Sequence, residues 1–155
     1  MSAVAMAQAS DLAAPKGDVV LTVTGAIGAS NGNGAAAFDI DMLKAMPAVT
    51  FKTHTNWTSG ETEFTGVALD AFLAALGAKG QNLHAVALND YAVDVPAADA
   101  TSGGPIIAYL MDGKEMSPRD KGPLWIVYPF DSKREYKTEA IYSRSIWQLN
   151  RIEIQ

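Results

Sequence analysis

Cysteine is absent from this 155-residue chain. Its absence excludes disulfides, zinc–thiolate sites, iron–sulfur clusters and thiol catalysis. Histidine is nearly absent too, since His54 and His84 are the only imidazole ligands that a transition metal could use. His84 opens an apolar strand and is expected to be structural. His54 has no second histidine or carboxylate at helical ligand spacing, so the sequence does not indicate a two-histidine metal site.

Positive charge is scarce and scattered. The 12 Lys and Arg residues stand against 17 Asp and Glu, for a net charge of −5, and no basic cluster offers a footprint for a phosphate backbone. Nucleic acid is therefore not an expected partner. No apolar run approaches the length needed to cross a bilayer. The 48% hydrophobic and 19% charged residues are typical of one folded globular domain.

The N-terminal sequence MSAVAMAQAS resembles the end of an export signal. Ala5-Met6-Ala7 before Gln8 fits the small-x-small pattern of a signal-peptidase site. The basic and apolar regions of such a signal are largely missing, so an ordinary alanine-rich disordered tail is the alternative. We expect residues 1–9 to be a residual signal or tail, residues 10–155 to form a single domain, and the mature protein to be periplasmic.

Short apolar runs predict a sheet-rich α+β domain with two or three short helices. Helices are expected in FDIDMLKAMP (38–47) and VALDAFLAAL (67–76), the second ended by a left-handed Gly77. The alternation in the last segment slips at Asn150-Arg151, as at a β-bulge, and GASNGNG (28–34) is typical of a turn. The strands are expected in DVVLTVTGAI (18–27), VTFKT (49–53), HAVALNDYAVDVP (84–96, interrupted at 89–91), IIAYLMDGKEM (106–116, with an Asp112-Gly113 turn), LWIVYPF (124–130) and SIWQLNRIEI (145–154).

The common nucleotide and hydrolase motifs are missing. The glycines of GASNGNG are not followed by the Gly-Lys-Ser or Gly-Lys-Thr of a phosphate loop. There is also no Gly-x-Ser-x-Gly nucleophile elbow, which argues against a serine hydrolase.

Three short segments carry candidate ligand-binding side chains. FKTHTNWTSGETEFTGVAL (51–69) contains a Trp that either covers the edge of the core or offers a stacking surface. Asn89-Asp90-Tyr91 is either a bulge or turn or a polar recognition site. YSRSIW (142–147) places Arg144 between aromatics, either solvated beside a core Trp or in a site.

These residues together would suit a flat heteroaromatic ligand, if the fold brings them together. Trp and Tyr faces stack on rings. Asp90 could accept two N–H bonds from an amino-pyrimidine edge, and Arg144 could donate to a ring oxygen or a phosphate. The set comprises His54, Asn56, Trp57, Asp90, Tyr91, Arg144 and Trp147.

The order of several segments resembles the molybdopterin-binding domain of the sulfite oxidase family over residues 18 to 155. The segments are FDIDMLKAMPAVTFKT, FTGVALDAFLAALG, ALNDYAVDVP, AYLMDGKEMSPRDKGPLWIVYP and SIWQLNRIEI. Within them, Gly66-Val67 leads a helix, Asn89-Asp90-Tyr91 interrupts a strand, and Gly122-Pro123-Leu124 precedes a strand that ends at Pro129. The resemblance implies the mixed, sheet-rich fold of that family.

The departure from the family concerns its metal. In catalytic members a cysteine thiolate ligates molybdenum, and that position falls at or next to Thr53 in THTNW. A threonine hydroxyl is a poor replacement for a soft thiolate, so no molybdenum is expected. What remains resembles a pterin pocket without the metal.

Small exported domains of this kind are similar to periplasmic pterin-binding proteins, which bind a reduced pterin and regulate a membrane-bound cyclic-di-GMP enzyme. The resemblance therefore implies a non-catalytic pterin sensor. The alternatives are an oxidoreductase that keeps the molybdenum cofactor with a non-cysteine ligand, and a vestigial fold that serves only as an interaction surface. The implied ligand-binding residues are Thr53, His54, Thr55, Asn56, Trp57, Asp90, Tyr91, Arg144 and Trp147.

Overall fold

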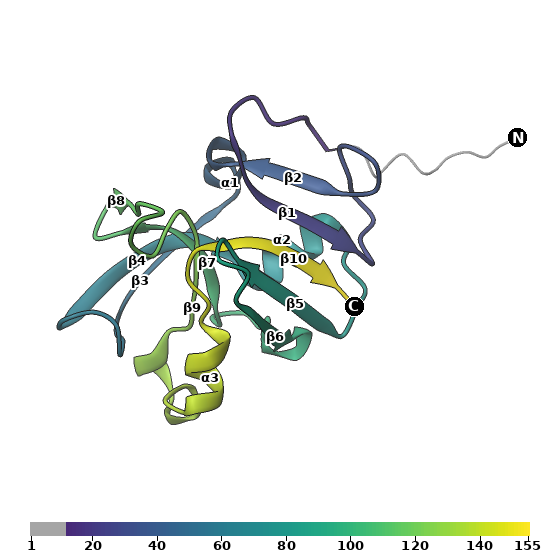
Figure 1. Cartoon of the computed structure of the whole chain (residues 1–155). Helices are drawn as coiled ribbons and strands as arrows, with labels where there is room; N and C mark the ends of the chain where they lie inside the picture. Colours follow the sequence, from purple (N-terminus) through teal and green to yellow (C-terminus); the bar gives the residue numbers. More distant parts are fainter. Residues whose placement is uncertain (1–11) are drawn as a thin grey trace, which may run out of the picture.

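The computed structural model describes residues 12–155, so the expectation of an export signal or tail at residues 1–9 lies outside the described residues. The described chain forms two β-sheets with three short α-helices (Figure 1). The strands are β1 (Val19–Gly25), β2 (Ala36–Asp39), β3 (Ala48–His54), β4 (Glu61–Ala68), β5 (Asn82–Ala87), β6 (Ala92–Pro96), β7 (Ile106–Met111), β8 (Lys114–Glu115), β9 (Trp125–Val127) and β10 (Leu149–Ile154). The helices are α1 (Ile40–Ala45), α2 (Leu69–Leu76) and α3 (Glu139–Arg144).

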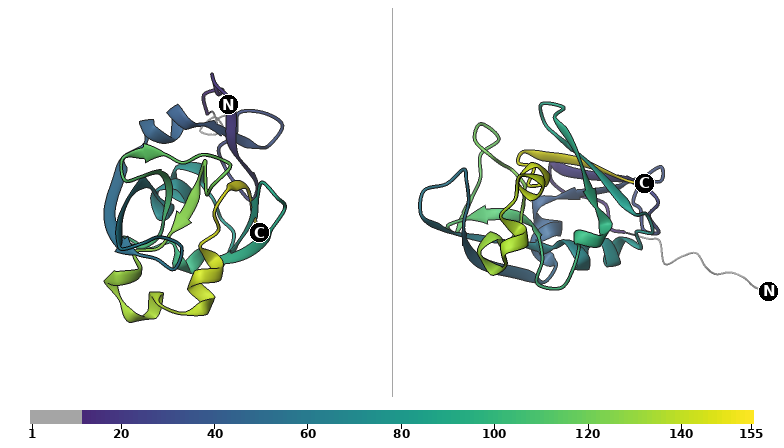
Figure 2. Two further views of the ribbon diagram at one scale, coloured as in Figure 1. Left: turned by 60° about the vertical axis from the view of Figure 1, so that its left-hand side comes forward. Right: turned by 90° about the horizontal axis from the view of Figure 1, so that it is seen from below.

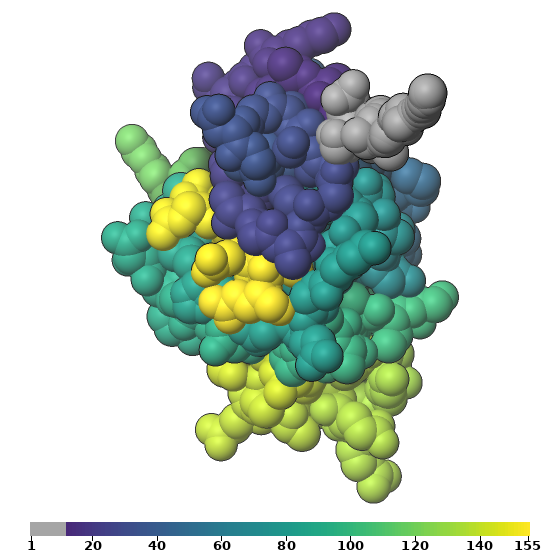
Figure 3. Space-filling model, turned by 90° about the vertical axis from the view of Figure 1, so that its right-hand side faces the viewer, coloured from purple at the N-terminus to yellow at the C-terminus, as the bar shows by residue number. Residues whose placement is uncertain are grey.

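The first sheet joins the two ends of the described chain. Its strand order is β2-β1-β10-β5-β6, with β1 and β10 parallel and the other neighbours antiparallel. The parallel pair can be followed in Figure 2, where the last strand is yellow and the first is purple. Alternate residues such as Leu21, Val23 and Ile152 are buried against the core, as a strand period of two requires. Residues of the last strand also reach the surface, between the purple and teal segments (Figure 3).

The second sheet carries the largest buried aromatic residues. Its order is β3-β4-β7, and both β8 and β9 pair with β7. Phe64 of β4 and Trp125 of β9 are fully buried, with ring centroids 5.2 Å apart and an edge-to-face angle of 85°. This is a favourable geometry for an aromatic pair, and it fixes β9 against the middle of the sheet.

Local signals explain where the helices begin and end. Asp39 caps α1 by accepting the Met42 N–H at 2.8 Å, and Pro47 follows its end. Hydrogen bonds from Gly17, Met42 and Lys16 lower the pKa of Asp39, because they favour the charged carboxylate. Gly77 ends α2 in the left-handed conformation, with φ 62° and ψ 36°. No helix within residues 12–155 is long and apolar enough to span a membrane.

Most of the expected elements are confirmed. The Gly77 cap, the turn before β2 and the Asp112-Gly113 turn between β7 and β8 are present. The predicted slip in the last strand is also present, as a register shift between Leu149 and Arg151 against β5. The sheet-rich α+β class with short helices is therefore correct.

Several boundaries were predicted wrongly. The expected helix 67–76 begins only at Leu69, because Gly66 and Val67 belong to β4, a strand that the sequence patterns did not indicate. The expected helix 38–47 begins at Ile40, because Phe38 and Asp39 belong to β2. Helix α3 lies in a segment for which no helix was specified, although Thr138 caps it by accepting the Ile141 N–H.

Gly66 lies at a point of close backbone approach between β4 and β7. A Cβ there would clash with the Ile107 carbonyl oxygen and lie 2.6 Å from the Ala108 Cα. We expect Gly66→Ala to lower the free energy of unfolding by about 1–3 kcal/mol, as overpacking does. Urea unfolding followed by circular dichroism measures the change. Gly32→Ala is the matched control, because a Cβ at Gly32 meets no atom within 4 Å. Equal stability of the two variants would contradict the packing argument.

Candidate functional site

A cleft of about 380 Å³ opens where the β3–β4 loop, the β5–β6 turn and the segment from α3 to β10 meet. Aromatic and small polar side chains make up most of its lining. The lining residues are Trp57, Ala87, Asn89, Tyr91, Tyr142, Ser143, Ser145, Ile146, Trp147 and Gln148. A cleft of this volume is within the usual range of about 300–1,000 Å³ for small-molecule sites.

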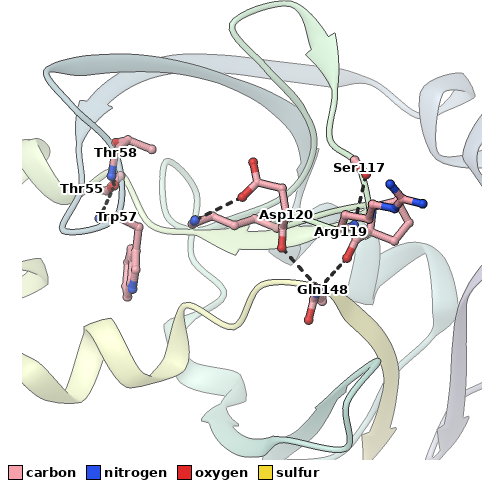
Figure 4. Close-up of polar contacts among 9 residues, drawn as sticks. Thr55, Trp57, Thr58, Ser117, Arg119, Asp120 and Gln148 are labelled. Atoms are coloured by element: carbon pink, nitrogen blue, oxygen red, sulfur yellow. Dashed lines mark hydrogen bonds and ion pairs between the residues drawn. The ribbon is translucent and has the colours of Figure 1, made fainter.

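Trp57 is fixed by its own loop and by the core. The Thr55 Oγ1 accepts the backbone N–H groups of Trp57 and Thr58, each at 3.0 Å (Figure 4). The half-buried indole meets Trp125 and Tyr142 edge to face, with centroids 5.8 and 6.0 Å apart. Trp57 therefore both covers the core edge and contributes to the cleft, which combines the two interpretations of the sequence.

The β5–β6 turn forms a second wall. The Ala87 N–H donates to the Tyr91 carbonyl at 2.8 Å, so Asn89-Asp90-Tyr91 is a tight turn, with Asp90 at φ 67°. Tyr91 lines the cleft although it is 52% exposed. The Asp90 carboxylate does not line it and lies 3.5 Å from Arg151.

The chain from Tyr142 to Gln148 forms the third wall. Gln148 has a left-handed backbone, with φ 55°, and its side-chain nitrogen donates to the carbonyls of Pro118 and Asp120 at 2.6 and 3.3 Å (Figure 4). Its own carbonyl accepts the Leu88 N–H at 2.9 Å, which ties this wall to the β5–β6 turn. Trp147 has the Lys121 ammonium 5.5 Å from its ring centroid, a cation–π distance.

The ten lining residues include no Asp, Glu, Lys, Arg or His. Four aromatic side chains provide ring faces, and Asn89, Ser143 and Gln148 provide neutral hydrogen-bonding groups. Such a lining can stack on a planar ring and bond its edge. Among these residues there is no carboxylate or imidazole, and the phenols of Tyr91 and Tyr142 are the groups that could move a proton.

The Thr53 end of β3 lies outside this lining. Thr53 is fully buried, and its Oγ1 accepts the Asp131 N–H at 3.0 Å. The Asp131 carboxylate also binds the Nδ1 and backbone N–H of His54, at 2.7 and 2.9 Å, and lies 3.3 Å from Lys137. These contacts, chiefly the His54 side chain, lower the pKa of Asp131 to about 2.

Arg144 also lies outside the lining. Its Nη1 donates to the Asp99 Oδ2 at 2.8 Å, and the same oxygen accepts the Tyr128 hydroxyl at 2.8 Å. Burial, the largest effect, and the Asp99 contact raise the pKa of Tyr128 far above its usual value, so it stays protonated.

The structure thus brings together Trp57, Tyr91 and Trp147 of the nine predicted site residues. The Thr55 hydroxyl accepts the Trp57 backbone N–H, and Asn56 is the exposed residue that precedes Trp57 in the chain. The other four, which do not line the cleft, are Thr53, His54, Asp90 and Arg144. Tyr142, Ser143 and Gln148 were missed, although they flank Arg144 and Trp147 in a segment already rich in aromatics.

The residues present do not fit a molybdenum centre held by a thiolate. The chain has no cysteine, and the hydroxyl of Thr53 is already bonded within the protein. Within residues 12–155, no group of three His, Cys, Asp or Glu side chains could hold a metal ion. A pterin ring alone needs none of these ligands, and the aromatic cleft offers it ring faces and neutral polar groups.

A solved structure with the same fold is the sulfane dehydrogenase SoxCD from Paracoccus pantotrophus. The likeness has a TM-score of 0.65 at 18% sequence identity and covers 86% of this chain. It covers only 37% of the SoxCD chain, so this protein matches about a third of that enzyme's length. No curated protein matches the sequence.

The sequence profile described as the oxidoreductase molybdopterin binding domain matches residues 20–132, from β1 to the turn after β9. This range includes Thr53 and the β5–β6 turn, and it ends before α3. The matched range is well over half of the chain, and the fold agrees with it. The chain belongs to the oxidoreductase molybdopterin-binding domain family.

Proposed function

We propose that this chain is a non-catalytic pterin-binding domain that senses a reduced pterin. The observation that carries the proposal is the uncharged cleft walled by Trp57, Tyr91, Tyr142 and Trp147. The pyrimidinone ring of a reduced pterin is flat, so aromatic faces can stack on it from either side. Membership of a family named for a pterin-containing cofactor supports this ligand over other planar rings.

Neutral polar groups at the cleft match the edge of a pterin. Asn89 Oδ1 accepts the Tyr91 N–H at 3.1 Å, which leaves its NH₂ group as a donor. The Gln148 nitrogen is bonded to Pro118 and Asp120, which leaves its side-chain oxygen as an acceptor. One donor and one acceptor suit an amino-pyrimidinone edge, which presents both kinds of group. These two residues take the role that the sequence assigned to Asp90 and Arg144.

We further propose that the protein acts in the periplasm and passes the pterin signal to the periplasmic domain of a membrane-bound cyclic-di-GMP enzyme or sensor. Ala5-Met6-Ala7 before Gln8 supports export. The partner is the one implied by the resemblance of the sequence segments to periplasmic pterin-binding proteins. An aromatic cleft at the surface also suits a sensor, because Tyr91 remains half exposed at its mouth.

An oxidoreductase is the second candidate, favoured by the family profile and by the fold shared with a dehydrogenase. The occupied Thr53 hydroxyl argues against it. We expect protein purified from its native host to contain no stoichiometric molybdenum by elemental mass spectrometry, with a pterin as its co-purifying ligand. Stoichiometric molybdenum in that sample would replace the sensor proposal with the enzyme.

The cleft predicts direct binding of a reduced pterin. We expect tetrahydrobiopterin, titrated anaerobically in a calorimeter, to bind saturably and to quench tryptophan fluorescence. Tyr91→Ala should weaken binding by about two- to tenfold, the loss expected for one stacking partner. Tyr91 is exposed, so its truncation should leave the fold unchanged.

Leu88→Ala is the matched control for that titration. Leu88 is in the same turn and 46% exposed, but it does not line the cleft. Trp57→Ala should weaken binding further, with thermal unfolding measured alongside because Trp57 also packs on Trp125. Absence of saturable binding to the wild-type protein would leave a bare interaction domain as the function.

The sensor proposal also predicts a cellular effect. In the native host, Tyr91→Ala should shift cyclic-di-GMP levels in the same direction as deletion of the whole protein, because both lower the amount of pterin-bound protein. Mass spectrometry of extracts measures the level, with Leu88→Ala as the control. A Tyr91→Ala strain that keeps wild-type levels while the deletion strain does not would show that the partner responds to the protein without its pterin.

A further inference from the structure

One short segment supplies most of the cleft. Six of the ten lining residues lie between Tyr142 and Gln148. This segment is the end of α3 and the chain that leads into β10. Helix α3 has only six residues, and an isolated helix of that length is not stable in water. Contacts with the rest of the protein must therefore hold this wall of the cleft in place.

Neutral contacts fix part of the wall. The Trp125 Nε1 donates to the Ser145 carbonyl at 3.2 Å, and the Ser145 Oγ donates to the Ile141 carbonyl at 2.8 Å. The N-terminal cap on Thr138 holds the other end of α3. These bonds join the helix to β9 and to itself, on the side of the second sheet.

A charged contact ties the same wall to the chain that follows β6, the edge strand of the first sheet. Arg144, the last residue of α3, donates to Asp99, in the short turn of 3₁₀ helix (Ala97–Asp99) that follows β6. The two side chains are only 27% and 20% exposed, so solvent screens the pair weakly. The buried Tyr128 hydroxyl holds the same carboxylate oxygen and fixes its position. Charge-assisted hydrogen bonds of this kind are short and directional.

We infer that Arg144 is a positioning residue, which acts with Asp99 to set the wall formed by Tyr142, Ser143 and Trp147 for the ligand. Its two neighbours, Ser143 and Ser145, line the cleft while its own side chain points to Asp99. The β6 strand that leads to Asp99 also carries the Tyr91 turn at its other end. One ion pair thus sets the distance between two walls of the cleft. The inference rests on the proposed pterin function for its affinity readout.

Paired variants separate positioning from direct contact. Arg144→Met and Asp99→Asn should each raise the Kd for tetrahydrobiopterin by about tenfold, since each loses a hydrogen bond to a charged group. The double variant should lose no more than the weaker-binding single variant, and Arg144→Lys should recover part of the affinity. Arg134→Met is the control for net charge, because Arg134 is exposed in a neighbouring turn and does not line the cleft.

A measurement without ligand keeps this inference separate from the proposed function. Hydrogen exchange followed by mass spectrometry should show faster exchange in residues 140–148 of Arg144→Met and Asp99→Asn, with residues 19–25 of β1 unchanged. This local effect is expected even if wild-type protein fails to bind tetrahydrobiopterin, a failure that would reject the pterin proposal alone.

Two results would overturn the inference. Weaker pterin binding in Arg144→Met with wild-type binding in Asp99→Asn would show that Arg144 contacts the ligand directly. Unchanged exchange in residues 140–148 of both variants would show that the pair does not hold the wall.

Discussion

The buried indole of Trp125 is the contact on which both the core and the cleft depend. It packs edge to face on Phe64 within the second sheet and on Trp57 at the cleft, with centroids 5.2 and 5.8 Å apart. Its N–H donates to the Ser145 carbonyl, and its backbone pairs with that of Trp147. A single side chain therefore connects the sheet, the Trp57 loop and the wall after α3. Trp57, Tyr142 and Trp147 of the cleft thus pack against the core.

Periodicity revealed the elements that are buried on one face or ended by a distinctive residue. Helix α2 was found from its apolar face and from Gly77, and the bulge in β10 from the slip at Asn150-Arg151. Strand β4 was missed because its alternation runs through Thr62, which is buried although polar, and through Gly66, which has no side chain. Gly66 faces the backbone of β7, a tertiary condition that no local pattern displays. Propensity alone could not have shown it.

The sequence predicted which residue types the candidate site contains. It did not predict which of the candidate residues would form contacts elsewhere in the protein. Aromatic residues near polar turns indicated a ring-binding site, and Trp57, Tyr91 and Trp147 do converge. The candidates with ionisable side chains lie outside the cleft and contact other parts of the chain: Arg144 contacts Asp99, Asp90 lies near Arg151 at the surface, and His54 contacts Asp131. A sequence shows which charges exist and leaves open which ones pair. The fold decides this, by placing distant segments within 4 Å of one another.

An internal contact also occupies the region where the resemblance places the family's metal ligand. The position expected for the thiolate falls at or next to the fully buried Thr53, whose hydroxyl accepts the Asp131 N–H and so holds the 3₁₀ turn (Phe130–Ser132) against β3. The hydroxyl oxygen of threonine accepts backbone N–H groups readily, whereas soft metal ions prefer thiolate ligands. The aromatic cleft, whose lining does not include Thr53, offers ring faces to a ligand. Its side chains can stack on a ring and form neutral hydrogen bonds with the ring edge.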